Sequence, residues 1–326
     1  MCSAEPLLVQ LLRLVDLVPL PPPPSSRPRG RPLIYPDRLF LKVVLFMTLR
    51  RIYRVHEVYS VLSQPSAEIL LIRAHLFPDA FPCRRTFERR LKRLPSTLEQ
   101  TIPLVGAMLV DLWRPWARSA RAAASDSTCL RASGAHWNKK DREAGTIPNT
   151  TIDTDANWTR SGWHGWVYGY KLHLISTIAN VWIPLAAKLR PANEADCTVM
   201  EALIPTLHVQ PSFICGDSAY NTDPVRLACD KHGATLVASS RGKAPRTDDG
   251  VEVRKIIHAL RHHAIENLNG LFKSIFDLRR PIPTKGHSGA ARYILGCLFT
   301  YQIALLYRYL EGDLHQVDIK PMLRSA

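Results

Sequence analysis

Three carboxylates in this sequence stand where a sheet and a helix could bring them together. Asp126 follows the small apolar run 120–125, and Asp217 follows the apolar run 212–216. Glu266 lies in a segment where apolar residues recur every three or four positions, as in an amphipathic helix. Strand ends of an α/β sheet gather at one edge, so we expect Asp126 and Asp217 to share a site to which the helix adds Glu266. Carboxylate oxygens are the ligands that Mg²⁺ and Mn²⁺ prefer.

Each of these carboxylates also has an ordinary structural explanation. Asp126 could cap a turn, and Asp217 could start a loop by accepting a hydrogen bond from its own backbone. Glu266 could form a surface ion pair with Arg261 or Lys273. The three carboxylates in this order, at two strand ends and in one helix, favour a shared functional site over three unrelated structural roles.

The elements that would position these residues follow residue 119. The order of the patterns is three strands, a helix, a strand, a helix, a strand and a long helix. The expected strands are 120–125, 167–178, 181–189, 212–216 and 235–238, and the expected helices are 196–207, 223–232 and 253–275. The second and third strands form a hairpin around a tight turn. The pattern predicts an α/β domain with a mixed sheet over residues 119–326.

Residues 35–118 have a helical pattern and predict several short helices packed together. Residues 84–94 place Phe87, Leu91 and Leu94 on one face and basic side chains around the rest. The second helix of a helix-turn-helix needs such an apolar back and a cationic front to contact DNA phosphates. A charged face on an ordinary surface helix would look the same. The residues expected to contact DNA are Arg84, Arg85, Arg89, Arg90, Lys92 and Arg93.

Residues 1–34 form a separate N-terminal segment. It begins as an amphipathic helix and continues into a stretch rich in proline and arginine, which proline keeps extended. Arg29 and Arg31 could lie in a narrow minor groove of DNA, as the arginines of basic arms do. A solvated linker is the alternative interpretation of this segment.

The charge balance supports a nucleic-acid partner. The 326 residues include 43 Lys and Arg against 28 Asp and Glu, which gives a net charge of +15, and residues 1–118 contribute 18 of the basic and 9 of the acidic residues. No apolar run reaches the about 18–20 residues needed to cross a bilayer, and residues 293–307 predict a buried helix. The seven cysteines are scattered without a CxxC pair, which indicates reduced thiols in a cytoplasmic protein.

Five short blocks in a fixed order carry a family resemblance. They are Asp126-Ser127-Thr128, Gly169-Tyr170-Lys171-Leu172-His173, Pro191-Ala192-Asn193-Glu194-Ala195-Asp196, Gly216-Asp217-Ser218-Ala219-Tyr220, and Arg261 through Ile265-Glu266 to Leu271-Phe272-Lys273. With them the chain resembles bacterial insertion-sequence transposases of the DDE type over most of residues 27–310. The resemblance implies a ribonuclease-H-like domain in which Asp126, Asp217 and Glu266 are catalytic and hold two Mg²⁺ or Mn²⁺ ions. It also implies DNA-contacting or positioning roles for Lys171, His173, Tyr220, Arg261 and Lys273.

These observations predict a transposase with a DNA-binding region over residues 35–118 and a DDE catalytic domain over residues 119–326. We expect it to cut the ends of an insertion element and transfer the strands in a metal-dependent reaction. The expected partners are double-stranded DNA and a second copy in a homodimer, at the nucleoid in bacterial cytoplasm and away from membranes. Two alternatives stay open, a catalytically inactive sequence-specific DNA-binding regulator and a ribonuclease-H-like nuclease that does not join strands. Metal dependence separates the first from a transposase, and a joined product separates the second.

Overall fold

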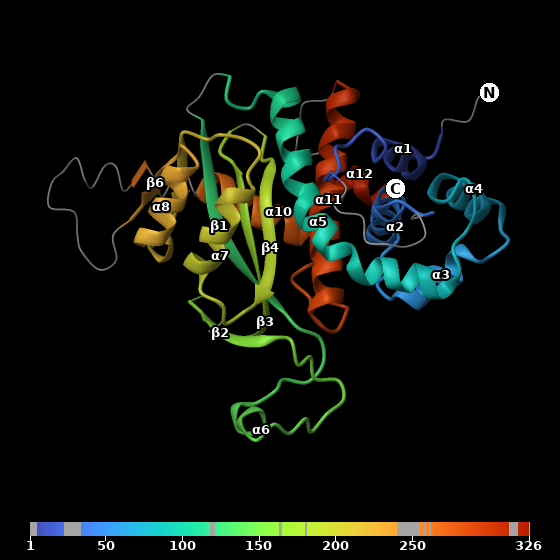
Figure 1. The fold of residues 1–326 in the computed structure, drawn as a ribbon, viewed down its shortest axis with the longest axis horizontal. Coiled ribbons are helices and arrows are strands. Elements are labelled where there is room, and N and C mark those ends of the chain that lie inside the picture. Colours follow the sequence, from blue (N-terminus) through green and yellow to red (C-terminus); the bar gives the residue numbers. More distant parts are fainter. Residues whose placement is uncertain are drawn as a thin grey trace, which may run out of the picture.

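A six-stranded mixed sheet forms the centre of the C-terminal half (Figure 1). The computed structural model describes residues 5–22, 34–117, 121–162, 165–179, 181–239, 255–256, 259–260, 262–312 and 319–325. The strands are β1 (Ala122–Arg131), β2 (Asn157–Ser161), β3 (Gly165–Thr177), β4 (Pro184–Pro191), β5 (Phe213–Gly216) and β6 (Thr235–Ala238). β1, β2 and β4 pair antiparallel with β3, whereas β1, β5 and β6 are parallel neighbours. This arrangement confirms the ribonuclease-H-like α/β fold.

Helices cover both faces of this sheet. The elements after β4 are α7 (Asp196–Leu203), the short 3-10 helices η1 (Ile204–Thr206) and η2 (Ser218–Tyr220), α8 (Asp223–Lys231), the π-helical turn η3 (His262–Glu266) and α10 (Asn267–Ile275). Ser125 Oγ bonds to Met200 Sδ of α7 at 3.0 Å, while the next residue, Asp126, accepts a hydrogen bond from Asn269 of α10. Successive strand residues point to opposite faces, so α7 and α10 lie on opposite faces of the sheet.

The N-terminal region is entirely helical in its described residues. It contains α1 (Leu7–Leu14), α2 (Asp37–Leu49), α3 (Val55–Leu62), α4 (Ala67–Leu76) and α5 (Arg84–Trp113), and its helices pack on α11 (His287–Leu310) and α12 (Ile319–Ser325). Most of these helices are short, as expected. The 30-residue α5 differs, because its backbone stays helical through Pro95 and Pro103.

α5 connects the helical region to the sheet. Gly106 lies so close to β4 that a Cβ atom there would be 2.5 Å from the carbonyl oxygen of Pro184. The buried Gln302 of α11 donates from Nε2 to the carbonyls of Ile102 in α5, at 2.8 Å, and of Pro184, at 2.9 Å. One hydrophobic core therefore runs from the N-terminal helices into the sheet. A separation at residue 118 remains a prediction about domains, since packing is continuous there.

Some details of the sequence-based prediction need correction. β1 continues to Arg131, so Asp126 lies inside the strand and not at its end. The expected strand was too short because residues after Asp126 are polar, yet they pair with β3 as far as Gly169. β2 and the small helix α6 (Lys139–Glu143) were not expected. α11 is long and apolar enough to cross a membrane, but 89% of its most apolar window is buried inside the protein.

Candidate active site

Asp126 and Asp217 stand at the same level of the sheet. The last parallel pair of β1 and β5 is Ala124 with Cys215. Asp126 comes two residues after Ala124, and Asp217 comes two residues after Cys215. Neighbouring strands lie about 4.8 Å apart, so the register brings the two carboxylates to one edge of the sheet. Both aspartates are half-buried. The two residues lie at the same level because β1 continues past the point where β5 stops, and a shared site for their carboxylates stays a prediction.

The backbone after β5 holds Asp217 in place. Its Oδ1 accepts a hydrogen bond from the Ala219 N–H at 2.8 Å, which caps η2. Gly216 lies directly under the ring of Tyr220, and a Cβ atom on Gly216 would be 2.8 Å from Tyr220 Cδ2. The turn therefore needs glycine at position 216 to bring Tyr220 beneath the aspartate. Asp217 therefore does start a loop by accepting a hydrogen bond from the nearby backbone, as its ordinary structural explanation proposed. The same bond orients the carboxylate.

The helix that follows Glu266 contacts Asp126. Asn269 Nδ2 donates to Asp126 Oδ2 at 3.1 Å. Glu266 and Asn269 are three residues apart across the join of η3 and α10, a spacing at which helical residues share a face. Glu266 itself is half-buried. Asn269 was not predicted, although its spacing from Glu266 is a signal that could have identified it.

The hydroxyl of Tyr220 is buried near several carboxylates. Its side chain is 2% exposed, and its pKa is raised well above 10, first by burial and then by the charges of Asp126, Asp196 and Asp217. These three carboxylates therefore surround one buried hydroxyl. Asp196 has its own cation, because Lys171 Nζ lies 2.9 Å from its Oδ1.

Basic groups lie behind and beside the carboxylates. His173 is 2% exposed, and burial lowers its pKa to about 4 although Asp196 acts in the opposite direction, so its ring is neutral at pH 7. Burial also lowers the pKa of Lys273, against the opposing charges of Cys129 and Asp126. Protein covers His173 and Tyr220, which argues against direct DNA contact by either side chain and leaves the positioning role as the prediction for both. Lys171 is bound to Asp196 and shares that role.

The proposed carboxylates lie within a stretch of the chain that matches a protein family. Residues 118–303, more than half of the chain, match the family model described as Transposase DDE domain. The chain belongs to this family of DDE-type transposases. A cryo-EM structure titled as a piggyBac transposase synaptic complex with hairpin DNA is similar, with a TM-score of 0.42 and 9% identity over 96% of this chain and 74% of that chain. No curated protein sequence matches the chain.

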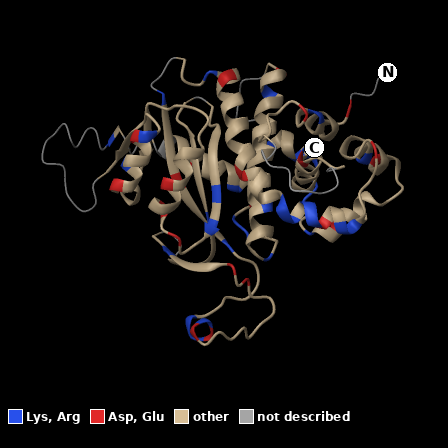
Figure 2. Cartoon of the chain, viewed as in Figure 1, with Lys and Arg blue, Asp and Glu red and all other residues tan. Residues whose placement is uncertain are grey.

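The first half of α5 presents the transposase's densest group of basic side chains (Figure 2). Its exposed members are Arg84, Arg85, Arg89, Lys92 and Arg93. Arg84 Nε is paired with Glu88 at 2.8 Å. Arg90 differs from the others, because its side chain is 11% exposed, bonds to Asp37 at 2.7 Å and stacks on Phe40 at 5.2 Å. The expected DNA contact of Arg90 is therefore corrected to a structural bond between α2 and α5.

Three predicted DNA-contacting residues, Arg29, Arg31 and Arg261, lie outside the described residues of the transposase. Their roles stay predictions. The expected helix over 253–275 is described only in part, and its described end begins with the π-helical turn η3. Such turns occur often at functional sites, because the extra residue re-aims the side chains around it.

The donor chemistry of the transposase site suits a hard divalent cation. Asp126 and Asp217 supply carboxylate oxygens, and Asn269 Oδ1 is a buried oxygen without a hydrogen-bond partner on the amide that binds Asp126. Oxygens of these types are the usual ligands of Mg²⁺. Across the described ranges, no group of three or more His, Cys, Asp or Glu side chains is placed to hold a metal ion. The two aspartates and the amide are thus the part of the site that the fold already assembles.

Proposed function

We propose that this DDE-family protein cuts DNA at the ends of a mobile element and joins the released 3′ ends to target DNA. Asp126, Asp217 and Glu266 would be the catalytic residues and would hold divalent cations, Mg²⁺ or Mn²⁺. The observation that carries the proposal is the shared register of Asp126 and Asp217 at one sheet edge, with the Glu266 helix bonded to Asp126 through Asn269. The match to the transposase family supports it.

The chain's own residues explain how such a site would be maintained. Two divalent ions, when bound, activate the attacking hydroxyl and stabilise the leaving oxygen of a phosphodiester. Asn269 fixes the orientation of Asp126, and the Ala219 N–H fixes that of Asp217. Lys171 neutralises Asp196. The negative charge that would repel DNA is then that of the three proposed catalytic carboxylates.

DNA would be bound mainly by the first half of α5. Arg85, Arg89, Lys92 and Arg93 are exposed there, on a helix whose opposite face is buried through Phe87. Cationic side chains on one helix face bind phosphates by releasing counterions. We propose double-stranded element ends and target DNA as partners, a homodimer as the working unit and bacterial cytoplasm at the nucleoid as the location.

The test uses duplex DNA that carries the inverted repeats flanking the coding region. Purified protein is incubated with these ends, target DNA and Mg²⁺, with and without chelator, and 3′-end cleavage and joined products are measured. Asp126→Asn, Asp217→Asn and Glu266→Gln are each expected to lower the strand-transfer rate by about 10³-fold or more, because each removes a metal ligand. DNA affinity is expected to stay near that of the wild type.

The matched control is Asp223→Asn, which removes a carboxylate from the exposed start of α8. It is expected to leave strand transfer unchanged. Full activity in any of the three site variants would contradict the assignment of that residue. Cleavage without a joined product would identify a nuclease, and binding without metal-dependent cleavage would identify a regulator.

A further inference from the structure

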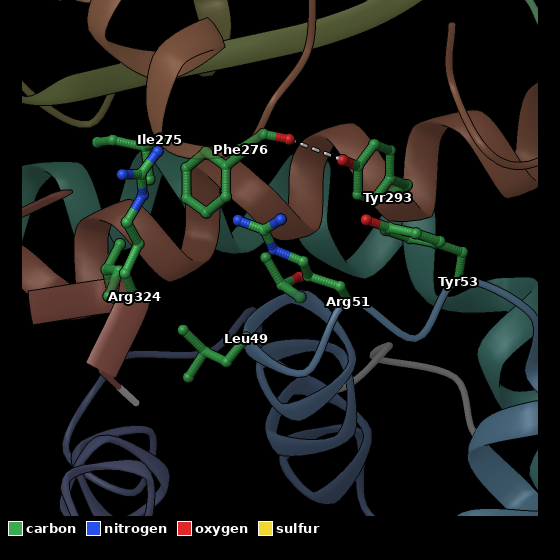
Figure 3. A pocket seen from close by; sticks show the side chains of 9 residues that line it. Leu49, Arg51, Tyr53, Ile275, Phe276, Tyr293 and Arg324 are labelled. Atoms are coloured by element: carbon green, nitrogen blue, oxygen red, sulfur yellow. Dashed lines mark hydrogen bonds between the residues drawn. The ribbon is translucent and has the colours of Figure 1, made fainter. Parts of the chain in front are cut away.

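An arginine-lined cavity lies away from the carboxylates, between the end of α2, the end of α10, and α11 and α12. Its volume is about 140 Å³. Figure 3 shows the guanidinium groups of Arg51 and Arg324 extending into the same space beside Phe276, with Tyr53 and Tyr293 on the far side. The Tyr293 hydroxyl donates to the carbonyl of Phe276 at 3.1 Å. Two separate segments of the chain thus direct positive charge into one hollow.

A third arginine stands behind this cavity. Arg292 borders a smaller inner hollow that shares Thr48, Tyr53 and Tyr293 with the cavity. Its residue is 8% exposed, and burial lowers its pKa to about 10 with no carboxylate acting on it. A buried guanidinium without a partner is costly, since burial of a charge is stabilising only when the charge is paired.

No acidic residue is found among the described residues that line the cavity. Among the described residues, the side chains of Arg51, Arg292 and Arg324 make no hydrogen bond or ion pair. The acidic group nearest the tyrosines, Asp277, is paired with Arg280 at 2.9 Å. Arg51 also adopts a left-handed backbone conformation with φ of 54°, which favours glycine or asparagine over arginine. The position holds arginine at some conformational cost.

The size of the cavity limits what it can accept. Pockets for whole small molecules usually measure about 300–1,000 Å³, so a cavity of about 140 Å³ fits one compact group and not a nucleotide. Guanidinium groups bind phosphate and carboxylate through paired N–H donors. A single phosphate that bridges Arg51 and Arg324, with Arg292 adding charge from behind, matches both the size and the charge.

The position of the cavity favours a phosphate of DNA. Glu266 immediately precedes α10, and Ile275 at the end of α10 lines the cavity. At 1.5 Å per residue, the two ends of this segment are about 14 Å apart, which equals roughly four base pairs of duplex rise. This axial separation is shorter than one turn of duplex DNA. We propose that this cavity binds a backbone phosphate of the DNA held at the catalytic carboxylates, an inference that rests on the proposed function.

The test measures DNA affinity as a function of salt concentration for the full-length protein with chelator present, so that no cleavage occurs. The probe is a fluorescent duplex of arbitrary sequence. Loss of one phosphate contact lowers the slope of log affinity against log salt by about 0.9 and weakens binding about tenfold near 0.1 M salt. Arg51→Gln and Arg324→Gln are each expected to show this loss, and the double variant is expected to lose no more, because both arginines hold one phosphate.

The matched control is Arg226→Gln, which removes the same charge from an exposed position on α8. This residue does not line the cavity. It is expected to leave the slope unchanged. If Arg51→Gln and Arg324→Gln show the control's slope, the proposal is overturned. The measurement needs no metal and no catalysis, so failure of strand transfer and failure of this site are distinguishable.

A second measurement separates DNA phosphate from a free anion. Arg292→Met is expected to raise the thermal unfolding midpoint, since it removes an unpaired buried charge, and also to weaken DNA binding. Inorganic phosphate is the second probe. If it raises the midpoint of the wild type but not of Arg51→Gln while the DNA slope stays unchanged, the cavity is a free-anion site and the DNA assignment is wrong.

Discussion

The charged side chains around Asp126 and Asp217 are held by the fold, whereas those on the first half of α5 are mostly exposed to solvent. At the sheet edge, Asp126 and Asp217 are half-buried and each carboxylate has a defined hydrogen-bond donor. On α5, Arg89 and Arg93 are exposed, with only a solvated helix face around them. The one buried member of that group, Arg90, is bonded within the fold.

This difference indicates two kinds of sensitivity to mutation. A site whose geometry is fixed from inside loses function when one supporting atom is removed, because the reacting groups must be held within a fraction of an ångström. A surface that binds phosphates by charge loses affinity in steps, one for each contact. The predictions below test whether the two regions can be separated in this way.

The largest effect is expected on α5. Replacing Arg85, Arg89 and Arg93 with glutamine should lower DNA affinity about 10³-fold near 0.1 M salt and reduce the salt slope by about 2.7, because three phosphate contacts are lost. Cleavage at saturating protein concentration should stay close to the wild-type rate. The measurements are fluorescence anisotropy over a salt series and single-turnover cleavage. If the cleavage rate at saturating protein concentration also fell about as much as the DNA affinity, the α5 arginines would take part in cleavage, and the two regions would not be separable.

An intermediate effect is expected from Asn269→Ala. Removing this amide frees Asp126 from its donor at 3.1 Å, and supporting residues of this kind typically change metal affinity or activity by about 10–100-fold. Calorimetric titration with Mg²⁺ or Mn²⁺ and the metal dependence of cleavage would both be measured, while DNA affinity should not change.

The control for that variant is Asn267→Ala, which changes the same residue type at an exposed position of α10. Its metal titration should match the wild type. If both asparagine variants behave alike, Asn269 acts on the stability of the helix and not on Asp126.

A comparison that needs no mutation concerns two cysteines, one in each region. Cys83, just before α5, is exposed, and its hydrogen bond with Thr86 lowers its pKa. Cys215 in β5 is 3% exposed, and burial raises its pKa to about 11. Because the thiolate is the reactive form, we expect an alkylating reagent at pH 8 to label Cys83 at least about 10²-fold faster than Cys215. Peptide mass spectrometry would measure both rates, and equal rates would show that β5 opens readily.

Local patterns were sufficient to predict the main elements of the sheet and the shared level of Asp126 and Asp217 on neighbouring strands. Strand ends and parallel register follow from apolar runs and their connections. The role of Arg90 could not be predicted, because its partner Asp37 lies on another helix, 53 residues away. The covered positions of His173 and Tyr220 likewise depend on how α7 and η2 pack over the sheet. Long-range packing decides which polar residues face solvent, and a single sequence does not display it.

The uninterrupted backbone of α5 has one further consequence. From Arg89 to Gly106, where the helix touches β4, the path along the helix is about 25 Å at 1.5 Å per residue, and Figure 1 shows that this path bends between the two halves of α5. The two halves of α5 are joined by helical backbone and not by a loop. The spacing between the sequence that is gripped and the bond that is cut would then be a property of this helix, and not of a flexible tether.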